Sequence, residues 1–278
     1  MPIAACRTER HLGFRFGALG RPLVGALMVA QLALAGCQTG GVDRSTTGSV
    51  GKPMTAADFQ QSVTYWGGRY TKDPANKDNA LNYAAALRRV GNTDQAVAVL
   101  QKAAIRYATD RDVLAAYGKA LAANGQFQLA LDAVRRAQTP DQPDWRLLSA
   151  EGAILDQLGQ PNDARALYQK ALAIKPNDPT VLSNLGISYV LTNQLPDAEK
   201  VLRVAAAQPG ADSRVRQNLA LVVGLQGRFA EAQQIARSEL SPQQAEENVA
   251  YLQAMLARQS QQKSRTTSAQ PMPPLPAG

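Results

Sequence analysis

Apolar and small residues recur along most of the chain at a spacing of 34 residues, with no insertion or deletion between copies. Within the unit 145–178, the residues at i, i+4 and i+7 of a first predicted helix share one face: Leu148, Gly152 and Leu155. A second predicted helix has the same kind of face, formed by Ala164, Tyr168 and Ala171. Gly159 lies between the two helices and Pro176 follows the second, so each predicted helix ends at a residue that favours termination.

Five copies of this helix–turn–helix unit follow one another: 77–110, 111–144, 145–178, 179–212 and 213–246. One turn position is shared by all of them and is filled by Gly91, Gly125, Gly159, Asn193 and Gly227. Five residues later every copy has an alanine: Ala96, Ala130, Ala164, Ala198 and Ala232. A helical period of this length is typical of solenoids, in which stacked helix pairs bury a continuous core and present an extended binding surface. The pattern therefore predicts an all-α solenoid.

The positions of these glycines, alanines and prolines resemble the tetratricopeptide repeat (TPR). The resemblance implies a right-handed superhelix of about five repeats, in which the first helix of each unit lines a concave groove. The segment from Ala56 to Pro74 resembles the second half of a degenerate repeat. Gln243 to Gln259 is predicted to form a capping helix, because the end repeats of a solenoid need a cover. We expect one solenoid domain over residues 56–259.

The first 36 residues have the layout of a secretory signal, with four arginines before an apolar run from Pro22 to Gly36. That run is shorter than the roughly 20 residues of a membrane-spanning helix. It ends in Leu34-Ala35-Gly36-Cys37, which resembles the bacterial lipobox and implies a lipid on Cys37. The alternative is an ordinary signal in which the cysteine is incidental. In lipoproteins with this motif an aspartate directly after the cysteine favours retention in the inner membrane. This chain has Gln38 there, so the resemblance favours an outer-membrane anchor facing the periplasm.

Two segments outside the repeats are predicted to lack regular structure. Residues 37–55 are rich in Gly, Ser and Thr, which predicts a flexible tether between the lipid on Cys37 and the first helix. Residues 260–278 are rich in Gln, Ser and Pro, which predicts a disordered tail. A proline-rich ligand role is the alternative for residues 271–276.

Histidine and cysteine are scarce: the chain has one histidine, His11, and two cysteines, Cys6 and Cys37. Removal of residues 1–36 leaves only Cys37, which excludes Cys/His zinc sites, other cysteine nucleophiles and Ser-His-Asp triads. The chain also has no glycine-rich phosphate loop. We therefore expect a protein that is not an enzyme and that has no cofactor, no metal and no small-molecule substrate.

The net charge of +8 overstates how basic the mature protein is expected to be. Residues 1–36 contain four arginines and one glutamate, so their removal lowers the charge from +8 to +5. The remaining basic residues are scattered and do not form a basic face interleaved with aromatic residues, as nucleic-acid binding would require. We expect protein partners, a membrane contact through the N-terminal lipid, and no nucleic acid.

The repeat register gives candidate groove residues on the first helices of units four and five. The candidates share apolar or amide side chains: Asn184, Ile187, Val190, Leu191, Asn218, Leu221 and Leu225. An apolar groove with amides that hydrogen-bond a ligand backbone would suit a helix or extended segment of a partner. The alternative is that the apolar residues pack against the fifth unit and the capping helix.

Residues Ser183–Ala236 resemble, more narrowly, the TadD lipoproteins of tight-adherence (Flp) pilus assembly. The resemblance is carried by Leu195-Pro196, Pro209-Gly210-Ala211 and residues 214–221, 224–229 and 248–255. It implies an outer-membrane scaffold that acts like a pilotin, with the pilus secretin or other Tad components as partners. A general periplasmic adaptor for cell-envelope or peptidoglycan machinery is the alternative.

Overall fold

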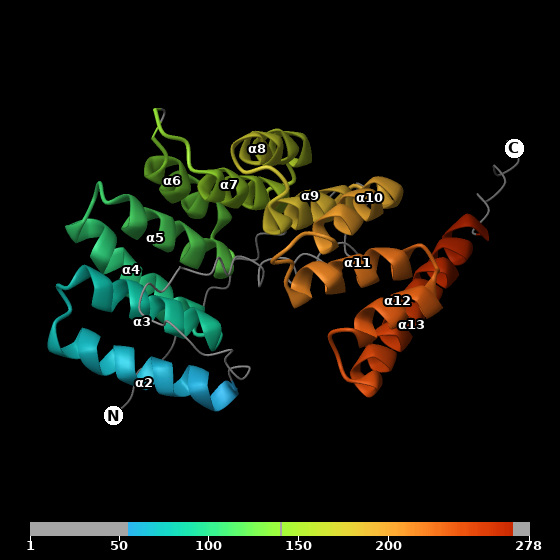
Figure 1. The fold of residues 1–278 in the computed structure, drawn as a ribbon, viewed down its shortest axis with the longest axis horizontal. Coiled ribbons are helices and arrows are strands. Elements are labelled where there is room, and N and C mark those ends of the chain that lie inside the picture. The colour runs from blue at the N-terminus through green and yellow to red at the C-terminus, as the bar shows by residue number, and fades with distance from the viewer. Residues whose placement is uncertain (1–54, 140, 269–278) are drawn as a thin grey trace, which may run out of the picture.

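The computed structural model describes residues 55–139 and 141–268. These residues form twelve α-helices and no strand (Figure 1). The helices are α2 (Ala56–Lys72), α3 (Lys77–Arg89), α4 (Thr93–Arg106), α5 (Arg111–Ala123), α6 (Phe127–Ala137), α7 (Trp145–Gln157), α8 (Pro161–Ile174), α9 (Pro179–Leu191), α10 (Leu195–Ala206), α11 (Ser213–Leu225), α12 (Phe229–Arg237) and α13 (Pro242–Ser268). The predicted all-α solenoid of five helix pairs, α3–α4 to α11–α12, is therefore confirmed.

The first helix of every repeat begins directly after an asparagine or aspartate. These residues lie one repeat period apart, at Asn76, Asp110, Asp144, Asp178 and Asp212. Each side chain accepts a hydrogen bond from a backbone N–H in the first helical turn. Such a cap satisfies a donor that the helix itself leaves unpaired and stabilises the helix by ~1 kcal/mol. The repeat period is thus also the spacing of the helix start signals.

The turn inside each repeat has a left-handed residue at the predicted position. The backbone φ is between 75° and 82° at Gly91, Gly125, Gly159 and Gly227. Asn193 replaces glycine in the fourth repeat and has a φ of 59°. Asparagine tolerates this region better than other residues with a side chain, so the substitution keeps the turn.

The two helices of a repeat approach each other closely where the first helix has a glycine. A Cβ atom built on Gly152 of α7 would lie 2.8 Å from Cε1 of Tyr168 and 3.0 Å from the carbonyl oxygen of Ala164, both on α8. A Cβ on Gly186 of α9 would lie 2.6 Å from Cγ of Leu202 on α10. These glycines are therefore required by packing, as their place in the repeat predicts.

Both ends of the solenoid are covered as expected. At the N-terminal end, Val63 and Tyr70 of α2 pack against the core between α3 and α4. At the C-terminal end, α13 buries Ala245 and Leu252, and Leu252 lies over Gly224 of α11. In Figure 1, α2 and α13 lie at opposite ends of the stack.

Helix α13 continues to Ser268, although the sequence predicts a disordered tail from residue 260 onward. Residues 260–268 contain no proline or glycine, and Gln, Lys and Arg are favourable helix formers, so the capping helix can extend without a stop signal. Residues 269–278 lie outside the described part of the chain. The predicted signal segment, Cys37 and the tether up to residue 54 lie outside it as well.

Candidate partner-binding groove

The first helices of successive repeats lie side by side along one face of the solenoid. Helix α3 contacts α5, α5 contacts α7, α7 contacts α9, and α9 contacts α11. Among the described residues, the second helices (α4, α6, α8, α10 and α12) have no comparable contacts with one another. Helices on the inside of a curved stack are closer together than those on the outside, so the first helices line the concave face.

The predicted apolar groove residues differ in how far they are covered. Ile187 on α9 is 7 % exposed, and Val190 packs against the core that includes Leu202. The structure leaves the remaining apolar residues half-buried: Leu191 on α9, and Leu221 and Leu225 on α11. The apolar surface that a partner can reach is therefore formed by the three leucines and the uncovered part of Val190, and Ile187 serves mainly in packing.

The two predicted amides connect neighbouring first helices. Nδ2 of Asn184 donates a hydrogen bond to Oγ of Ser149, 3.0 Å away on α7. Nδ2 of Asn218 on α11 donates likewise to Oγ of Ser183 on α9, at 2.9 Å. A side-chain amide has two N–H donors and a carbonyl oxygen, so each bond uses only part of its capacity. Both amides are half-buried, held in a fixed position and still able to pair with a peptide backbone.

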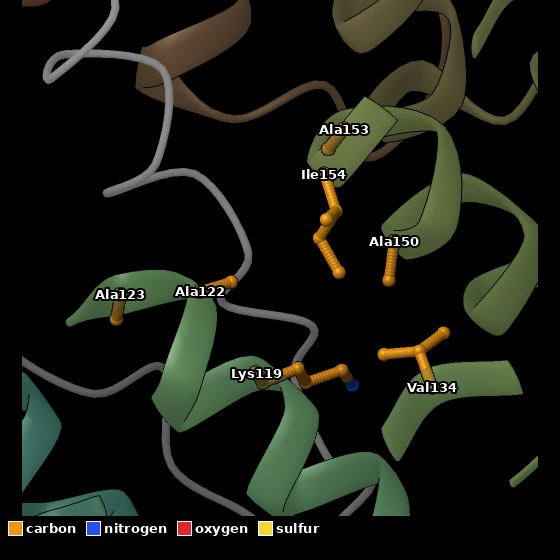
Figure 2. Close-up of a pocket in the computed structure, with 7 residues that line it drawn as sticks. All are labelled: Lys119, Ala122, Ala123, Val134, Ala150, Ala153 and Ile154. Atoms are coloured by element: carbon orange, nitrogen blue, oxygen red, sulfur yellow. The ribbon is translucent and has the colours of Figure 1, made fainter. Parts of the chain in front are cut away.

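A small hollow lies between α5 and α7 (Figure 2). It is lined by Lys119, Ala122 and Ala123 of α5, Val134 of α6, and Ala150, Ala153 and Ile154 of α7. Figure 2 shows Lys119 extending toward the space between Val134 and Ala150. Every lining residue except Lys119 is apolar, so the hollow combines small apolar side chains with one cation.

A partly buried polar cluster joins repeats three and four. Asp156 on α7 accepts a hydrogen bond from the hydroxyl of Tyr168 at 2.9 Å and one from the hydroxyl of Ser188 at 2.8 Å. Arg165 on α8 donates to the carbonyl oxygen of Ser188 at 3.1 Å and lies 4.4 Å from the ring centroid of Tyr189. We call Asp156, Arg165, Tyr168 and Ser188 the middle joint.

The surroundings of Asp156 change its acidity. Burial raises the pKa of its carboxyl to about 6, although the two hydroxyl donors and Arg165 act in the opposite direction. In the other repeats this register position is filled by Arg88, Ala122, Val190 and Gly224. The middle joint is thus the one place in the five repeats where this position has a carboxylate.

Repeats four and five are joined by an ion-pair network near the surface. Glu199 on α10 accepts hydrogen bonds from Arg228 at 2.7 Å and 2.9 Å and from Arg203 at 2.8 Å. Glu231 on α12 pairs with the same two arginines. Hydrogen bonds from Arg228 lower the pKa of Glu199 to about 2, and those from Gln226 and Arg203 act in the same direction. We call Glu199, Arg203, Arg228 and Glu231 the C-terminal joint.

Over residues 55–139 and 141–268, no three His, Cys, Asp or Glu side chains are placed to hold a metal ion. In the same ranges, no helix combines the length and the apolar composition needed to cross a membrane.

Two features were missed by reasoning from the sequence. The N-terminal caps of the first helices have a clear sequence signal, since one Asn or Asp precedes every first helix at the repeat spacing. The middle joint has almost none, because Asp156, Tyr168 and Ser188 come from three helices and only stacking brings them together. A carboxylate at a register position that is otherwise mostly apolar is the only hint.

Comparisons with known proteins identify the repeat. Three sequence profiles, each described as a tetratricopeptide repeat, match residues 81–144, 157–222 and 214–238. They cover parts of all five structural repeats. Among curated proteins, none matches the chain significantly.

Several solved structures share the fold. A thermophilic TPR protein of Thermus thermophilus is 19% identical, covers 64% of this chain and 100% of its own, and has a TM-score of 0.57. A tetratricopeptide-repeat protein of Parabacteroides merdae is 15% identical over 78% of this chain and 88% of its own, with a TM-score of 0.55. The APC/C hetero-tetramer Cut9–Hcn1 has a chain that is 14% identical over 86% of this chain and 43% of its own, with a TM-score of 0.58. At these identities the likeness shows the fold alone.

Proposed function

Because this chain belongs to the tetratricopeptide-repeat proteins, we propose that it is a scaffold that binds a segment of another protein on its concave face, at α9 and α11. One observation carries the location: α9 and α11 contain half-buried Leu191, Leu221 and Leu225 as well as Asn184 and Asn218, whose amides are fixed by serines of the neighbouring first helices. Leucines supply apolar contact, and positioned amides can pair with the backbone of an extended or helical segment.

We further propose that the scaffold is anchored in the outer membrane by a lipid on Cys37 and takes part in assembly of a tight-adherence (Flp) pilus. The support is the lipobox-like sequence before Cys37 and the TadD-like residues of 183–236, which include α9 and α11. In this role the protein acts like a pilotin and the partner is the pilus secretin or another Tad component. In this role the concave face lies in the periplasm.

The test of the groove combines a cellular and a binding measurement. Cells that lack the protein are complemented with the parent chain or with Leu221→Glu/Leu225→Glu, and secretin multimers in the outer membrane are quantified. We expect the double variant to leave multimer formation impaired, because two charges replace apolar contacts. Leu129→Glu on α6 is the matched control, since Leu129 is 57 % exposed on a second helix and its change should have no effect.

The outcomes distinguish the proposal from its alternative. Normal secretin assembly with the double variant, at unchanged helicity and abundance, contradicts the groove. Normal assembly in cells that lack the protein altogether contradicts the pilus role and favours a general adaptor of peptidoglycan or envelope enzymes. Cys37→Ser tests the anchor separately: loss of fatty-acid labelling and release from membranes are expected, and retention of both would contradict lipidation.

A further inference from the structure

The capping helix α13 has an exposed row of side chains on the face that points away from the solenoid. Its other face, which includes Ala245 and Leu252, is buried against α11 and α12. On a helix with 3.6 residues per turn, residues at i, i+4, i+7 and i+11 lie in one row along one face. The row opposite the buried face consists of exposed residues: Glu247, Tyr251, Ala254 and Arg258. We call these four residues the α13 stripe.

The α13 stripe contains an aromatic ring that is not covered by the solenoid. Tyr251 is 69 % exposed, although tyrosine rings bury a large area when a partner is present. Helix α13 lies at the C-terminal end of the stack, and it is the last helix of the described residues (Figure 1). No further helix of the described chain therefore covers the ring.

The order of side chains along the α13 stripe is complementary to itself. Its residues are separated by four, three and four positions, so the spacing is the same in both directions. Suppose that a second copy lies antiparallel, with a twofold axis at the midpoint of the stripe. Glu247 of each copy then faces Arg258 of the other, and the large ring of Tyr251 faces the small side chain of Ala254. Symmetry forms both contacts twice.

Other arrangements fit the same residues less well. A parallel pair would place Glu247 against Glu247 and Arg258 against Arg258, and like charges repel. An apolar partner or a lipid core would remove both charged groups from water without pairing them. The carboxylate of Glu247 accepts a hydrogen bond from Gln243 at 2.9 Å, and a carboxylate has further acceptor sites for an arginine.

We propose that α13 is a dimerisation helix and that its partner is α13 of a second copy of this chain, packed antiparallel. Exposed Ala250 and Ala257 border the stripe, and such small side chains allow helix axes to approach to ~8 Å. The stripe is smaller than the ~800 Å² per partner of a standard interface, so we expect a weak dimer. This inference does not depend on the proposed groove. The dimer has two concave faces, one from each copy.

Cysteine cross-linking of the full chain tests the antiparallel orientation. Two differently tagged copies, one with Glu247→Cys and one with Arg258→Cys, are produced in the same cells and oxidised. The two cysteines face each other in the antiparallel pair, and the remaining glutamate and arginine keep one ion pair, so a disulfide between the tags is expected. Each variant alone should give none, because equal positions lie ~16 Å apart along the pair. The parent chain gives the background from Cys6 and Cys37.

Charge reversal tests the complementarity of the stripe. Sedimentation of the purified full chain in detergent, at a series of protein concentrations, gives the dissociation constant of the dimer. Glu247→Arg should raise this constant roughly tenfold, because two like charges then face each other. Glu247→Arg/Arg258→Glu should restore it, because both ion pairs form again with their signs exchanged. Glu246→Arg is the matched control: it makes the same change at an exposed position beside the stripe and should have no effect.

Three results would contradict the proposal, provided that circular dichroism shows each variant to be folded. Disulfides within each single variant, and none between the two, would indicate a parallel pair. Sedimentation of the parent that does not change with concentration would show a monomer. A dimer that is unaffected by both Glu247→Arg and Tyr251→Glu would have its contact elsewhere. The proposed groove is tested separately by Leu221→Glu/Leu225→Glu.

Discussion

Two neighbouring joints of the solenoid contain carboxylates in different surroundings. In the middle joint, Asp156 is partly buried and its hydrogen-bond partners are the neutral hydroxyls of Tyr168 and Ser188. In the C-terminal joint, Glu199 is surrounded by the guanidinium groups of Arg203 and Arg228. Burial raises the pKa of Asp156 to about 6, and charged donors lower that of Glu199 to about 2. The same chemical group thus favours protonation at one joint and ionisation at the next.

This difference shows that neighbouring repeats can be joined by different kinds of contact. The charged form of Asp156 opposes folding, because water solvates a carboxylate better than the middle joint does. The charged form of Glu199 supports folding, because it is paired on several sides. The two joints should therefore respond to pH in opposite directions.

The largest expected effect comes from removing the ring at the centre of the middle joint. Tyr168→Ala should lower the free energy of unfolding by ~3–5 kcal/mol, because Tyr168 is 1 % exposed and fills the space beside Gly152. Leu202→Ala, at the same repeat position in repeat four and fully buried, is the matched change and should cost ~2–5 kcal/mol. Urea unfolding measures both. A loss below ~1 kcal/mol for Tyr168→Ala alone would mean that the middle joint is not tightly packed.

A smaller effect should follow from neutralising the partly buried carboxylate of Asp156. Because the folded pKa of Asp156 lies above the ordinary value of 3.8, stability should fall as the pH rises from about 4 through 6. Asp156→Asn removes this loss and should raise the free energy of unfolding at pH 7 by ~1–3 kcal/mol. Urea unfolding at several pH values between about 4 and 7.5 provides the measurement. A variant that is less stable than the parent at pH 7 would show that the charged form is supported by its hydroxyl donors.

The smallest effect is expected at the C-terminal joint. Glu199→Gln should lower the free energy of unfolding at pH 7 by ~1 kcal/mol, the scale of ion pairs near the surface. Because the folded pKa of Glu199 lies below its ordinary value of 4.5, the parent loses this stabilisation as the pH falls from about 4.5 toward 2. The difference between variant and parent should also shrink in about 1 M salt. A difference that persists at a pH of about 2 would have to arise from packing.

The fold was predictable because its signals are local and repeated. Gly91, Gly125 and Gly159 mark turns, and Ala164 marks a close contact, whichever repeat they belong to. The exposure of each groove residue was less predictable. The register position of a residue determines which face of its helix it lies on, but not how closely the neighbouring helix packs over it. Ile187 and Leu221 share a position, yet only Ile187 is nearly covered.

The middle joint was unpredictable for a related reason. Asp156, Tyr168 and Ser188 are each ordinary in sequence, and their chemistry arises only when α7, α8 and α9 meet. The length of α13 was underestimated because its last residues lack both a stop signal and an apolar face to align. The lipid on Cys37 stays a prediction.

The caps at Asn76, Asp110, Asp144, Asp178 and Asp212 make each repeat a self-contained module. Each first helix has its own start signal and each turn has its own left-handed residue. A duplication or loss of one whole period would therefore leave every remaining helix with its boundaries intact. A gene for such a chain can therefore lengthen or shorten the concave face in steps of one module.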